Sequence, residues 1–337
     1  MSRPLRFGIL GAANIAHAFA AGVASADSIK IVAVASRDAA KAEKFALEFG
    51  IERRFGSYDA MLASPELDAV YIPLPNAMHA EWSIRAAEAG KHVLCEKPLA
   101  MSAGEAADMF ASARRCGVVL REAYPYLAQP QTVRTRELIA EGAIGRLQMI
   151  RASFGLAFSD KSNIRLNPAL GGGCLLDAGS YPVSLCRILA GSSPKRVQSV
   201  ARWTDDAVDR TLVSTIDFAN GVLAQISCSF ATAFHRHAII AGDDGIIETD
   251  FTNHAWANSP PVIKLRRGLG FRTPYEILEP TGGDGFRLEA EEFAGLVKGD
   301  QTRWHGASPD ESLDIARTLD AIAKSARADG RWVDLEP

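Results

Sequence analysis

Long apolar runs, dense basic clusters and closely spaced cysteines are all missing from this sequence. No segment reaches the roughly 18 consecutive apolar residues that a membrane-spanning helix needs. A formal net charge of −3 and the lack of basic runs argue against nucleic acid or a membrane surface as a partner. These absences together are typical of a soluble globular protein that acts on small molecules.

The five cysteines are odd in number, widely spaced and without a Cys-x-x-Cys pair. This pattern fits reduced thiols better than a disulfide framework. The start of the chain, Met1 to Pro4, runs into a strand without the apolar segment of a secretory signal. We therefore expect a cytoplasmic protein. We expect no metal, because His235 and His237 could share one face of a strand but no third ligand is evident.

The length of the chain and the pattern of its predicted helices and strands fit two domains of different fold class. Its 337 residues, 47% of them apolar and 23% charged, suffice for two globular units. Up to residue 123, short apolar strands alternate with helical segments, which predicts a parallel sheet of Rossmann type. From Arg146 the chain turns to long alternating segments, at 146–156, 195–204, 210–219 and 221–231. We therefore predict an α/β domain over 1–123 and an α+β domain over 124–337 built on a large, mainly antiparallel open sheet.

The first predicted strand, near 6–10, runs into a turn of small residues and an alanine-rich helix. A glycine there allows a tight turn, and small residues let a pyrophosphate approach the backbone at the helix N-terminus. The usual pattern has glycine at both positions where this chain has Ala13 and Ala16. The location between strand and helix still predicts a dinucleotide site formed by Gly11, Ala12, Ala13, Asn14 and Ile15.

The end of the second predicted strand is where the ribose 2′ position of a dinucleotide is recognised. An acidic residue there binds the 2′-hydroxyl of NAD, whereas an arginine accommodates the 2′-phosphate of NADP. Ser36 and Arg37 stand at this position, and Lys41 could add to a phosphate site. Asp38 is the competing ribose ligand, although it also suits the N-cap of a helix over 39–49. The pattern favours NADP over NAD.

A further buried strand, Ala69 to Ile72, leads into a rigid Pro-x-Pro segment. Such a segment would pack beside a flat ring, so we expect Pro73, Leu74 and Asn76 to contact the cofactor. Asn76 is also a predicted N-cap for a helix over 77–89. His79, in the first turn of that helix, is expected to face the cofactor, with a structural role as the alternative.

Cys95-Glu96-Lys97-Pro98 follows a short apolar strand that begins at His92. Ligands of open α/β sheets bind outside the carboxyl ends of the strands, so we predict that Glu96 and Lys97 lie at the cofactor. The Lys97-Pro98 bond can be cis, which proline alone makes inexpensive. The alternative is that Lys97 is an ordinary solvated lysine on a loop.

These segments occur together in one known family. Gly8 to Gly11 (GILG), Ala35 to Arg37 (ASR), Ala89 to Pro98 (AGKHVLCEKP) and Gly171 to Pro182 (GGGCLLDAGSYP) resemble the glucose–fructose oxidoreductase/inositol dehydrogenase (Gfo/Idh/MocA) family. The chain is most similar to the branch of dihydrodiol dehydrogenases and NADP-dependent aldose 1-dehydrogenases, which has tyrosine where inositol dehydrogenases have histidine. That tyrosine is Tyr181 here. Leu127 and Gln129 depart from the family, whose usual arginine and histidine at these places contact substrate.

The resemblance implies an oxidoreductase that uses NADP and acts on a hydroxyl or carbonyl group of a sugar, such as xylose or glucose, or of a related diol. It implies Tyr181 as the acid/base, with Lys97 polarising the substrate oxygen and holding the nicotinamide ribose, and with Asp177 orienting the pair. A phenol is a poor base at neutral pH, and a nearby ammonium favours the phenolate. Without the resemblance, a core tyrosine and a helix cap would be the expected roles of Tyr181 and Asp177.

Three other functions remain open on the sequence: an NADP-binding sensor without turnover, a lyase or hydrolase with the dinucleotide as a fixed redox relay, and a glucose–fructose-type oxidoreductase that holds NADP tightly. The presence of both Lys97 and Tyr181 argues against the sensor. A homodimer is also expected, because an uncovered sheet face would expose apolar side chains, and the resemblance implies the same. The side chains expected on that face are Val213, Ile216, Leu223 and Ile226.

Overall fold

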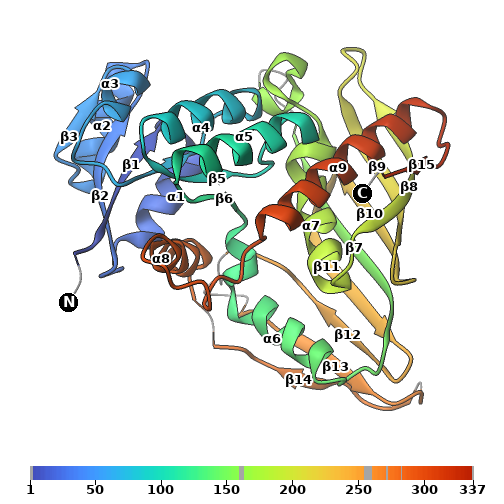
Figure 1. Ribbon diagram of the computed structural model, residues 1–337. Coiled ribbons are helices and arrows are strands. Elements are labelled where there is room, and N and C mark those ends of the chain that lie inside the picture. The colour runs from blue at the N-terminus through green and yellow to red at the C-terminus, as the bar shows by residue number, and fades with distance from the viewer. Residues whose placement is uncertain (1–2, 159–162, 254–259, 271, 282, 336–337) are drawn as a thin grey trace.

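The computed structural model describes residues 3–158, 163–253, 260–270, 272–281 and 283–335. Its first part is a sheet of six parallel strands in the order β3-β2-β1-β4-β5-β6, with helices on both faces (Figure 1). The strands are β1 Leu5–Leu10, β2 Ile29–Ala35, β3 Arg53–Phe55, β4 Ala69–Ile72, β5 His92–Glu96 and β6 Leu120–Ala123. The helices are α1 Asn14–Val23, α2 Ala39–Phe49, α3 Tyr58–Leu62, α4 His79–Glu88 and α5 Ala103–Cys116. The Rossmann-type prediction is confirmed.

Local signals explain the bounds of α2. The carboxylate of Asp38 accepts hydrogen bonds from the backbone N–H groups of Ala40 and Lys41, at 3.0 and 3.2 Å, and so satisfies donors that a helix start leaves free. Gly50 ends the helix in the left-handed region, with φ 64°. The predicted N-cap role of Asp38 is therefore confirmed.

The second part is a sheet of nine strands in the order β14-β13-β12-β11-β7-β10-β9-β8-β15. Neighbouring strands run antiparallel except for β7 and β10, so the mainly antiparallel prediction is confirmed. Its strands are β7 Leu147–Ala157, β8 Pro194–Trp203, β9 Asp209–Phe218, β10 Leu223–Ser229, β11 Ala231–Gly242, β12 Gly245–Thr249, β13 Ile263–Arg267, β14 Glu276–Leu278 and β15 Val333–Asp334. Helices α6 Pro130–Ala140 and α7 Ser180–Ala190 belong to the same part. A tight turn at Asn220-Gly221 joins β9 to β10 as a hairpin.

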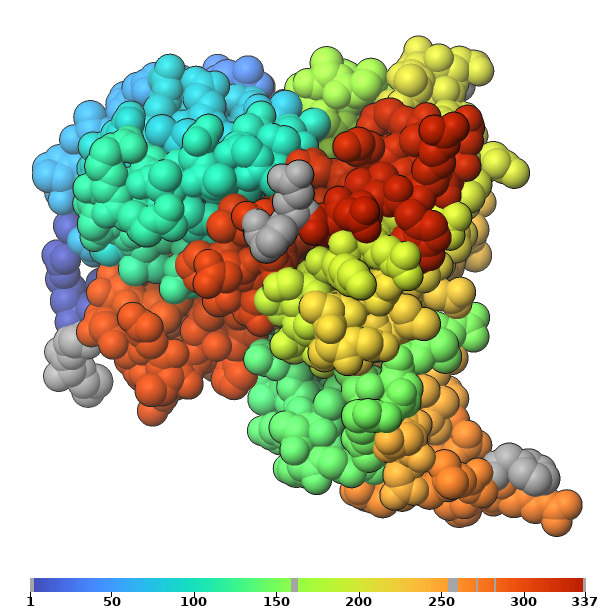
Figure 2. All heavy atoms as spheres, turned by 45° about the vertical axis from the view of Figure 1, so that its right-hand side comes forward, coloured from blue at the N-terminus to red at the C-terminus, as the bar shows by residue number. Residues whose placement is uncertain are grey.

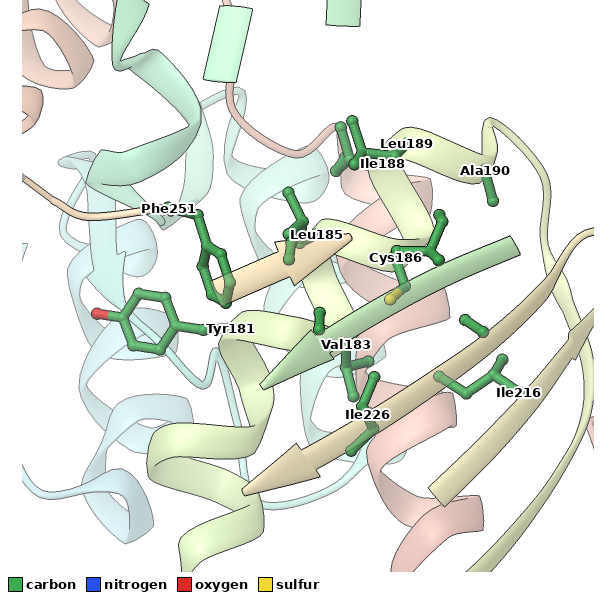
Figure 3. Packing of buried hydrophobic residues seen from close by; sticks show 14 of the residues in the cluster. Tyr181, Val183, Leu185, Cys186, Ile188, Leu189, Ala190, Ile216, Ile226 and Phe251 are labelled. Atoms are coloured by element: carbon green, nitrogen blue, oxygen red, sulfur yellow. The ribbon is translucent and has the colours of Figure 1, made fainter. Parts of the chain in front are cut away.

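The two faces of this large sheet differ. Ile216 and Ile226 are buried in the hydrophobic cluster to which α7 belongs, and Figure 3 shows Ile226 next to Val183. Val213 and Leu223 lie on the opposite face and are 53% and 49% exposed. The expectation that all four side chains share one open face was wrong, because side chains three residues apart on a strand point to opposite faces.

Two helices near the end of the chain return to the first part (Figures 1 and 2). Helix α8, Gly285–Val297, places Phe286 and Phe293 in the same hydrophobic cluster as Phe7, Phe19 and Tyr71. Helix α9, Pro309–Arg327, packs on α5 and on β8, and so joins the two parts. The six-stranded sheet ends at Ala123 and the nine-stranded sheet begins at Leu147, whereas α8 and α9 follow most of the second sheet in the chain and pack on the first part. The domain boundary at residue 123 stays a prediction. No helix within the described ranges is long and apolar enough to cross a membrane.

Candidate active site

The carboxyl ends of the parallel strands open onto a cleft of about 700 Å³ between the two parts. The first part contributes backbone and small side chains from the turn after β1, the Pro-x-Pro segment after β4, and the turn after β5. The second part contributes mainly charged and aromatic side chains from separate segments. The lining includes Ala12, Ala13, Asn14, Ile15, Lys41, Pro73, Leu74, Asn76, Glu96, Lys97, Phe154, Asn163, Arg165, Gly171, Asp177, Tyr181, Arg236 and Asn253.

The turn after β1 fits the pyrophosphate of a dinucleotide. Gly11 has φ 111°, and a Cβ there would lie 3.0 Å from Leu74 Cδ2, so glycine is required. Helix α1 begins after Ala13 with no side chain capping it, which leaves backbone N–H groups of its first turn facing the cleft. An uncapped N-terminus favours an anion through its N–H groups and the helix dipole. Alanine in place of glycine at positions 13 and 16 therefore still leaves this helix N-terminus without a side-chain cap.

The end of β2 lacks a carboxylate free to hold a ribose. One carboxylate oxygen of Asp38 caps α2 by accepting backbone hydrogen bonds, and the other oxygen lies 3.9 Å from the Lys41 ammonium. Ser36 is buried, and its hydroxyl accepts a hydrogen bond from the Asp38 N–H at 3.1 Å. Arg37 is exposed and forms no ion pair with any residue that the structure describes. These side chains fit a 2′-phosphate better than a 2′-hydroxyl.

Two predictions after β4 need correction, the N-cap role of Asn76 and the cofactor contact of His79. Asn76 caps no helix: residues Asn76–Met78 form a short 3-10 turn, α4 begins at His79, and the Asn76 amide donates to the Gly171 carbonyl at 2.9 Å. His79 is fully buried and does not line the cleft. Its ring nitrogens lie 2.8 Å from the carbonyls of Pro98 and Leu74, and burial lowers its pKa. His79 therefore fixes the two turns that flank the cleft rather than facing a cofactor.

Lys97 follows β5 directly, and the Lys97-Pro98 bond is cis, as expected. Its ammonium donates to Asp177 Oδ1 at 2.8 Å and to the Asp177 carbonyl at 3.1 Å. Arg165 Nε donates to the other carboxylate oxygen at 2.6 Å. Burial by itself would raise the pKa of the Asp177 carboxyl, but Lys97 and Arg165 together lower it to about 2. Asp177 is thus a carboxylate that holds two cations in place.

Tyr181 lies at the start of α7 and closes the other side of the cleft. The Lys97 ammonium is 4.8 Å from the centre of its ring. The phenol oxygen accepts a hydrogen bond from Asn253 Nδ2 at 3.1 Å. Figure 3 shows the ring at the margin of the hydrophobic core with its hydroxyl directed away from the other labelled side chains. The structure therefore brings Lys97, Asp177 and Tyr181 together from two distant segments.

Glu96 lies beside Lys97 and is buried. It accepts a hydrogen bond from the Tyr71 hydroxyl, and burial raises its pKa. Behind it, burial and the charge of Glu96 raise the pKa of Glu289, whose two carboxyl oxygens have no hydrogen-bond partner in the described part of the chain. Since Glu289 belongs to α8, the helix that returns to the first sheet also supports the floor of the cleft.

The two departures from the family lie outside the cleft lining. Gln129 donates to the carbonyls of Asn253 and Gly283, both at 2.8 Å, and so positions the segment that carries Asn253. Leu127 is fully buried in the core. His235 and His237 are also remote from Lys97, and the described residues contain no group of three or more His, Cys, Asp or Glu side chains arranged for a metal.

Sequence reasoning missed several side chains of the cleft, among them Phe154, Arg165, Arg236 and Asn253. Arg165 lies only 12 residues before Asp177, in the segment that precedes the glycine-rich loop. Arg236 and Asn253 come from β11 and from the chain after β12. No local spacing links these positions to Tyr181, so only the folded sheet reveals them.

Comparison with known proteins agrees with this geometry. A family described as "Oxidoreductase family, NAD-binding Rossmann fold" matches residues 5–124, and the "GFO/IDH/MocA C-terminal domain" matches residues 132–248. D-xylose 1-dehydrogenase (NADP(+)) 2 of Haloferax volcanii is 37% identical over 98% of this chain and 100% of its own length. Trans-1,2-dihydrobenzene-1,2-diol dehydrogenase of Danio rerio is 32% identical over 87% of this chain and 88% of its own.

A solved structure covers both parts of the chain as well. It is KijD10, a 3-ketoreductase from Actinomadura kijaniata in complex with NADP and TDP-benzene. Its TM-score is 0.87 at 31% identity, and the match covers 96% of this chain and 98% of that one. The two domain matches and these full-length relatives place the chain in the GFO/IDH/MocA family of oxidoreductases.

Proposed function

We propose that this protein is an NADP-dependent oxidoreductase that acts on a hydroxyl or carbonyl group of a sugar or related diol. The observation that carries the proposal is the Lys97 ammonium at the carboxyl edge of the parallel sheet, which is hydrogen-bonded to Asp177 and lies 4.8 Å from the centre of the Tyr181 ring. The relatives named above, a xylose dehydrogenase, a dihydrodiol dehydrogenase and a 3-ketoreductase, support the same class of reaction. A sensor without turnover would need neither a charged lysine nor a phenol at this place.

In this proposal the residues divide the binding and the proton chemistry. The α1 N-terminus, with Gly11, Ala12, Ala13, Asn14 and Ile15, holds the pyrophosphate, and Ser36, Arg37 and Lys41 hold the 2′-phosphate. Pro73, Leu74, Asn76 and Glu96 line the cofactor's path to Lys97. The bound nicotinamide supplies the hydride acceptor or donor.

Proton transfer falls to the residues of the chain itself. On oxidation, the hydroxyl proton of the substrate passes to Tyr181 Oη, and on reduction it returns. Lys97 polarises the substrate oxygen, because its ammonium attracts the negative charge that develops there. Asp177, fixed by Arg165, keeps the Lys97 ammonium in place.

A panel of aldoses and dihydrodiols, assayed with NADP and with NAD, tests this function. We expect reduction of NADP with at least one member of the panel. An absorbance scan of the pure protein near the NADPH band separates an exchangeable cofactor from the tightly held one of a glucose–fructose-type enzyme. Binding of NADP without any turnover would leave only the sensor.

Replacing Arg37 with alanine should weaken NADP binding by about 1.5–3 kcal/mol, the magnitude of a hydrogen bond to a charged group. NAD binding should change little, because NAD lacks the phosphate. Titration of the wild type and of Arg37→Ala with NADP and with NAD measures the change in affinity for each cofactor. Arg85→Ala is the matched control, because Arg85 lies on α4 outside the cleft lining. An equal loss for both cofactors would show that Arg37 does not recognise the 2′ position.

We also propose a homodimer that pairs the open faces of the large sheets, because Val200, Val213 and Leu223 are exposed there. Light scattering at micromolar concentration should give twice the chain mass. Val213→Glu should shift the mass towards the monomer, whereas Leu47→Glu, on α2 away from the sheet, should not. A monomeric wild type would reject the pairing.

The location that we propose is the cytoplasm. All five cysteines are free thiols, and four of them are buried, which suits a reducing compartment. Fractionation of cells that produce the protein tests this location.

A further inference from the structure

Arg236 is a buried cation in the wall of the cleft. It lies on β11 and is 9% exposed. Its guanidinium is 4.0 Å from the centre of the Tyr181 ring, and the rings of Phe251, Phe154 and Tyr126 surround it at 4.8, 5.0 and 5.4 Å. The catalytic roles proposed above leave this arginine unused, although it is the charged group closest to the face of Tyr181.

Unlike the other cations of the cleft, Arg236 has no carboxylate partner. Lys97 and Arg165 share Asp177, and Lys41 lies near Asp38. In the described ranges Arg236 has only neutral hydrogen-bonding neighbours, the Asn253 side-chain oxygen at 3.5 Å and the Tyr181 phenol, and its Nε has no partner.

Asp250 exerts an attractive charge on Arg236 but forms no ion pair with it. That carboxylate is more than half exposed and lies 3.5 Å from His237 instead. Burial lowers the pKa of Arg236 to about 10, so the side chain is still a cation at neutral pH. Within the part of the chain that the structure describes, no carboxylate therefore forms an ion pair with this charge of the cleft.

A buried cation without a counter-ion is costly, and the surrounding rings offset part of that cost. Rings that cover the faces of a guanidinium leave its in-plane N–H groups available, and these match a carboxylate or phosphate in geometry. Around Tyr181, Lys97 and Arg165 pair with the carboxylate of Asp177, which leaves Arg236 as a positive charge without an ion-pair partner among the described residues. A neutral sugar would leave this excess of positive charge in place, whereas an anionic one would balance it.

We propose that Arg236 binds an acidic group of the substrate, so that the preferred substrate is a polyhydroxylated anion, a sugar acid or a sugar phosphate. This inference rests on the proposed function, since it concerns the substrate of the same cleft. Arg236 acts as a specificity residue here: it holds the anion while the reacting hydroxyl lies beside Tyr181.

The test compares two probes that differ only in the acidic group. D-gluconate and D-sorbitol have the same carbon chain, and both are titrated calorimetrically into the protein saturated with NADPH, which prevents oxidation. We expect gluconate to bind about 10–100-fold more tightly than sorbitol, the range of a charged hydrogen bond. D-glucose 6-phosphate and D-glucuronate, titrated in parallel, show whether phosphate or carboxylate is preferred and at which end of the chain.

Variants assign the preference to Arg236. Arg236→Met should bring gluconate to the weaker affinity of sorbitol, Arg236→Lys should keep part of the preference, and Arg202→Met, on the exposed end of β8, should keep all of it. If Arg236→Met fails to fold, the ratio of gluconate to sorbitol affinity in the wild type and in Arg236→Lys still tests the inference. Equal affinities of gluconate and sorbitol in the wild type, or an unchanged ratio in Arg236→Met, overturn the inference.

Failure of the inference is distinguishable from failure of the proposed function. Turnover of neutral aldoses with NADP, together with equal binding of the two probes, would reject the anion site and keep the oxidoreductase. Absence of NADPH binding, or of turnover with every neutral and acidic sugar, would reject the oxidoreductase itself.

Discussion

Tyr181→Phe should lower the rate of hydride transfer by ~10²–10⁴-fold, the usual contribution of a general acid or base. The substitution removes only the phenol oxygen, which accepts a hydrogen bond from Asn253, neighbours Arg236 and is directed away from the core. The ring remains and keeps its contacts with Tyr124, Tyr126 and Phe154. We therefore expect the fold and the NADP affinity to stay near those of the wild type.

Single-turnover rates with the best substrate of the panel measure this effect. Tyr275→Phe is the matched control and should leave the rate unchanged. It removes a phenol that donates a hydrogen bond to Glu248 on the outer part of the sheet. A wild-type rate in Tyr181→Phe would remove Tyr181 from the proton chemistry. His79 could not replace it, although its position in the sequence made it the next candidate, because both of its ring nitrogens face backbone carbonyls.

The same experiment extends to Lys97. Lys97→Met should lower the rate of hydride transfer by a comparable factor. It removes the cation 4.8 Å from the centre of the Tyr181 ring and leaves Arg165 as the cation that binds Asp177. The double variant should lose far less than the product of the two single losses, because residues that act as a unit are not additive. Fully multiplicative losses would mean that Lys97 and Tyr181 contribute independently.

Much of the first part could be predicted from the sequence because its signals are local. The strand Ile29–Ala35 and the helix Ala39–Phe49 have the bounds that apolar alternation, an Asp N-cap and a terminal glycine indicate. The turn after β5 puts Lys97 at the carboxyl edge of the sheet, as the strand–turn pattern required. The predictions for Asn76 and His79 were wrong because the roles of these residues depend on groups that local signals do not show. Asn76 binds the Gly171 carbonyl, and His79 binds the carbonyls of Leu74 and Pro98.

The second half of the site depended on tertiary structure. Tyr181, Arg236 and Asn253 come from α7, β11 and the chain after β12, and their contacts form only when the nine-stranded sheet brings these elements together. The sheet faces, in contrast, could have been assigned from spacing alone. Val213 and Ile216 are an odd number of residues apart, so the period of two puts them on opposite faces whatever surrounds them.

The position of α8 could not be predicted, and it leads to the second large effect. An amphipathic helix near the chain end shows which of its faces is apolar but not which sheet it covers. In the structure, Phe293 is fully buried, with its ring centre 5.8 Å from that of Phe7 in β1. Residues of β4 and β5 belong to the same hydrophobic cluster, so α8 helps to cover one face of the parallel sheet.

Phe293→Ala should therefore lower the free energy of unfolding by about 3–5 kcal/mol, the usual cost of removing a buried phenylalanine side chain. The loss should appear in the first part of the protein, although residue 293 follows the second sheet in the chain. Urea unfolding measures it, and Leu47→Ala is the control, because Leu47 is exposed on α2 in that same part and should change stability by less than roughly 0.5 kcal/mol. If Phe293→Ala lowers the free energy of unfolding by no more than Leu47→Ala does, the parallel sheet is stable without α8. A loss of the expected size would instead mean that a fragment ending at residue 123 lacks part of its own core.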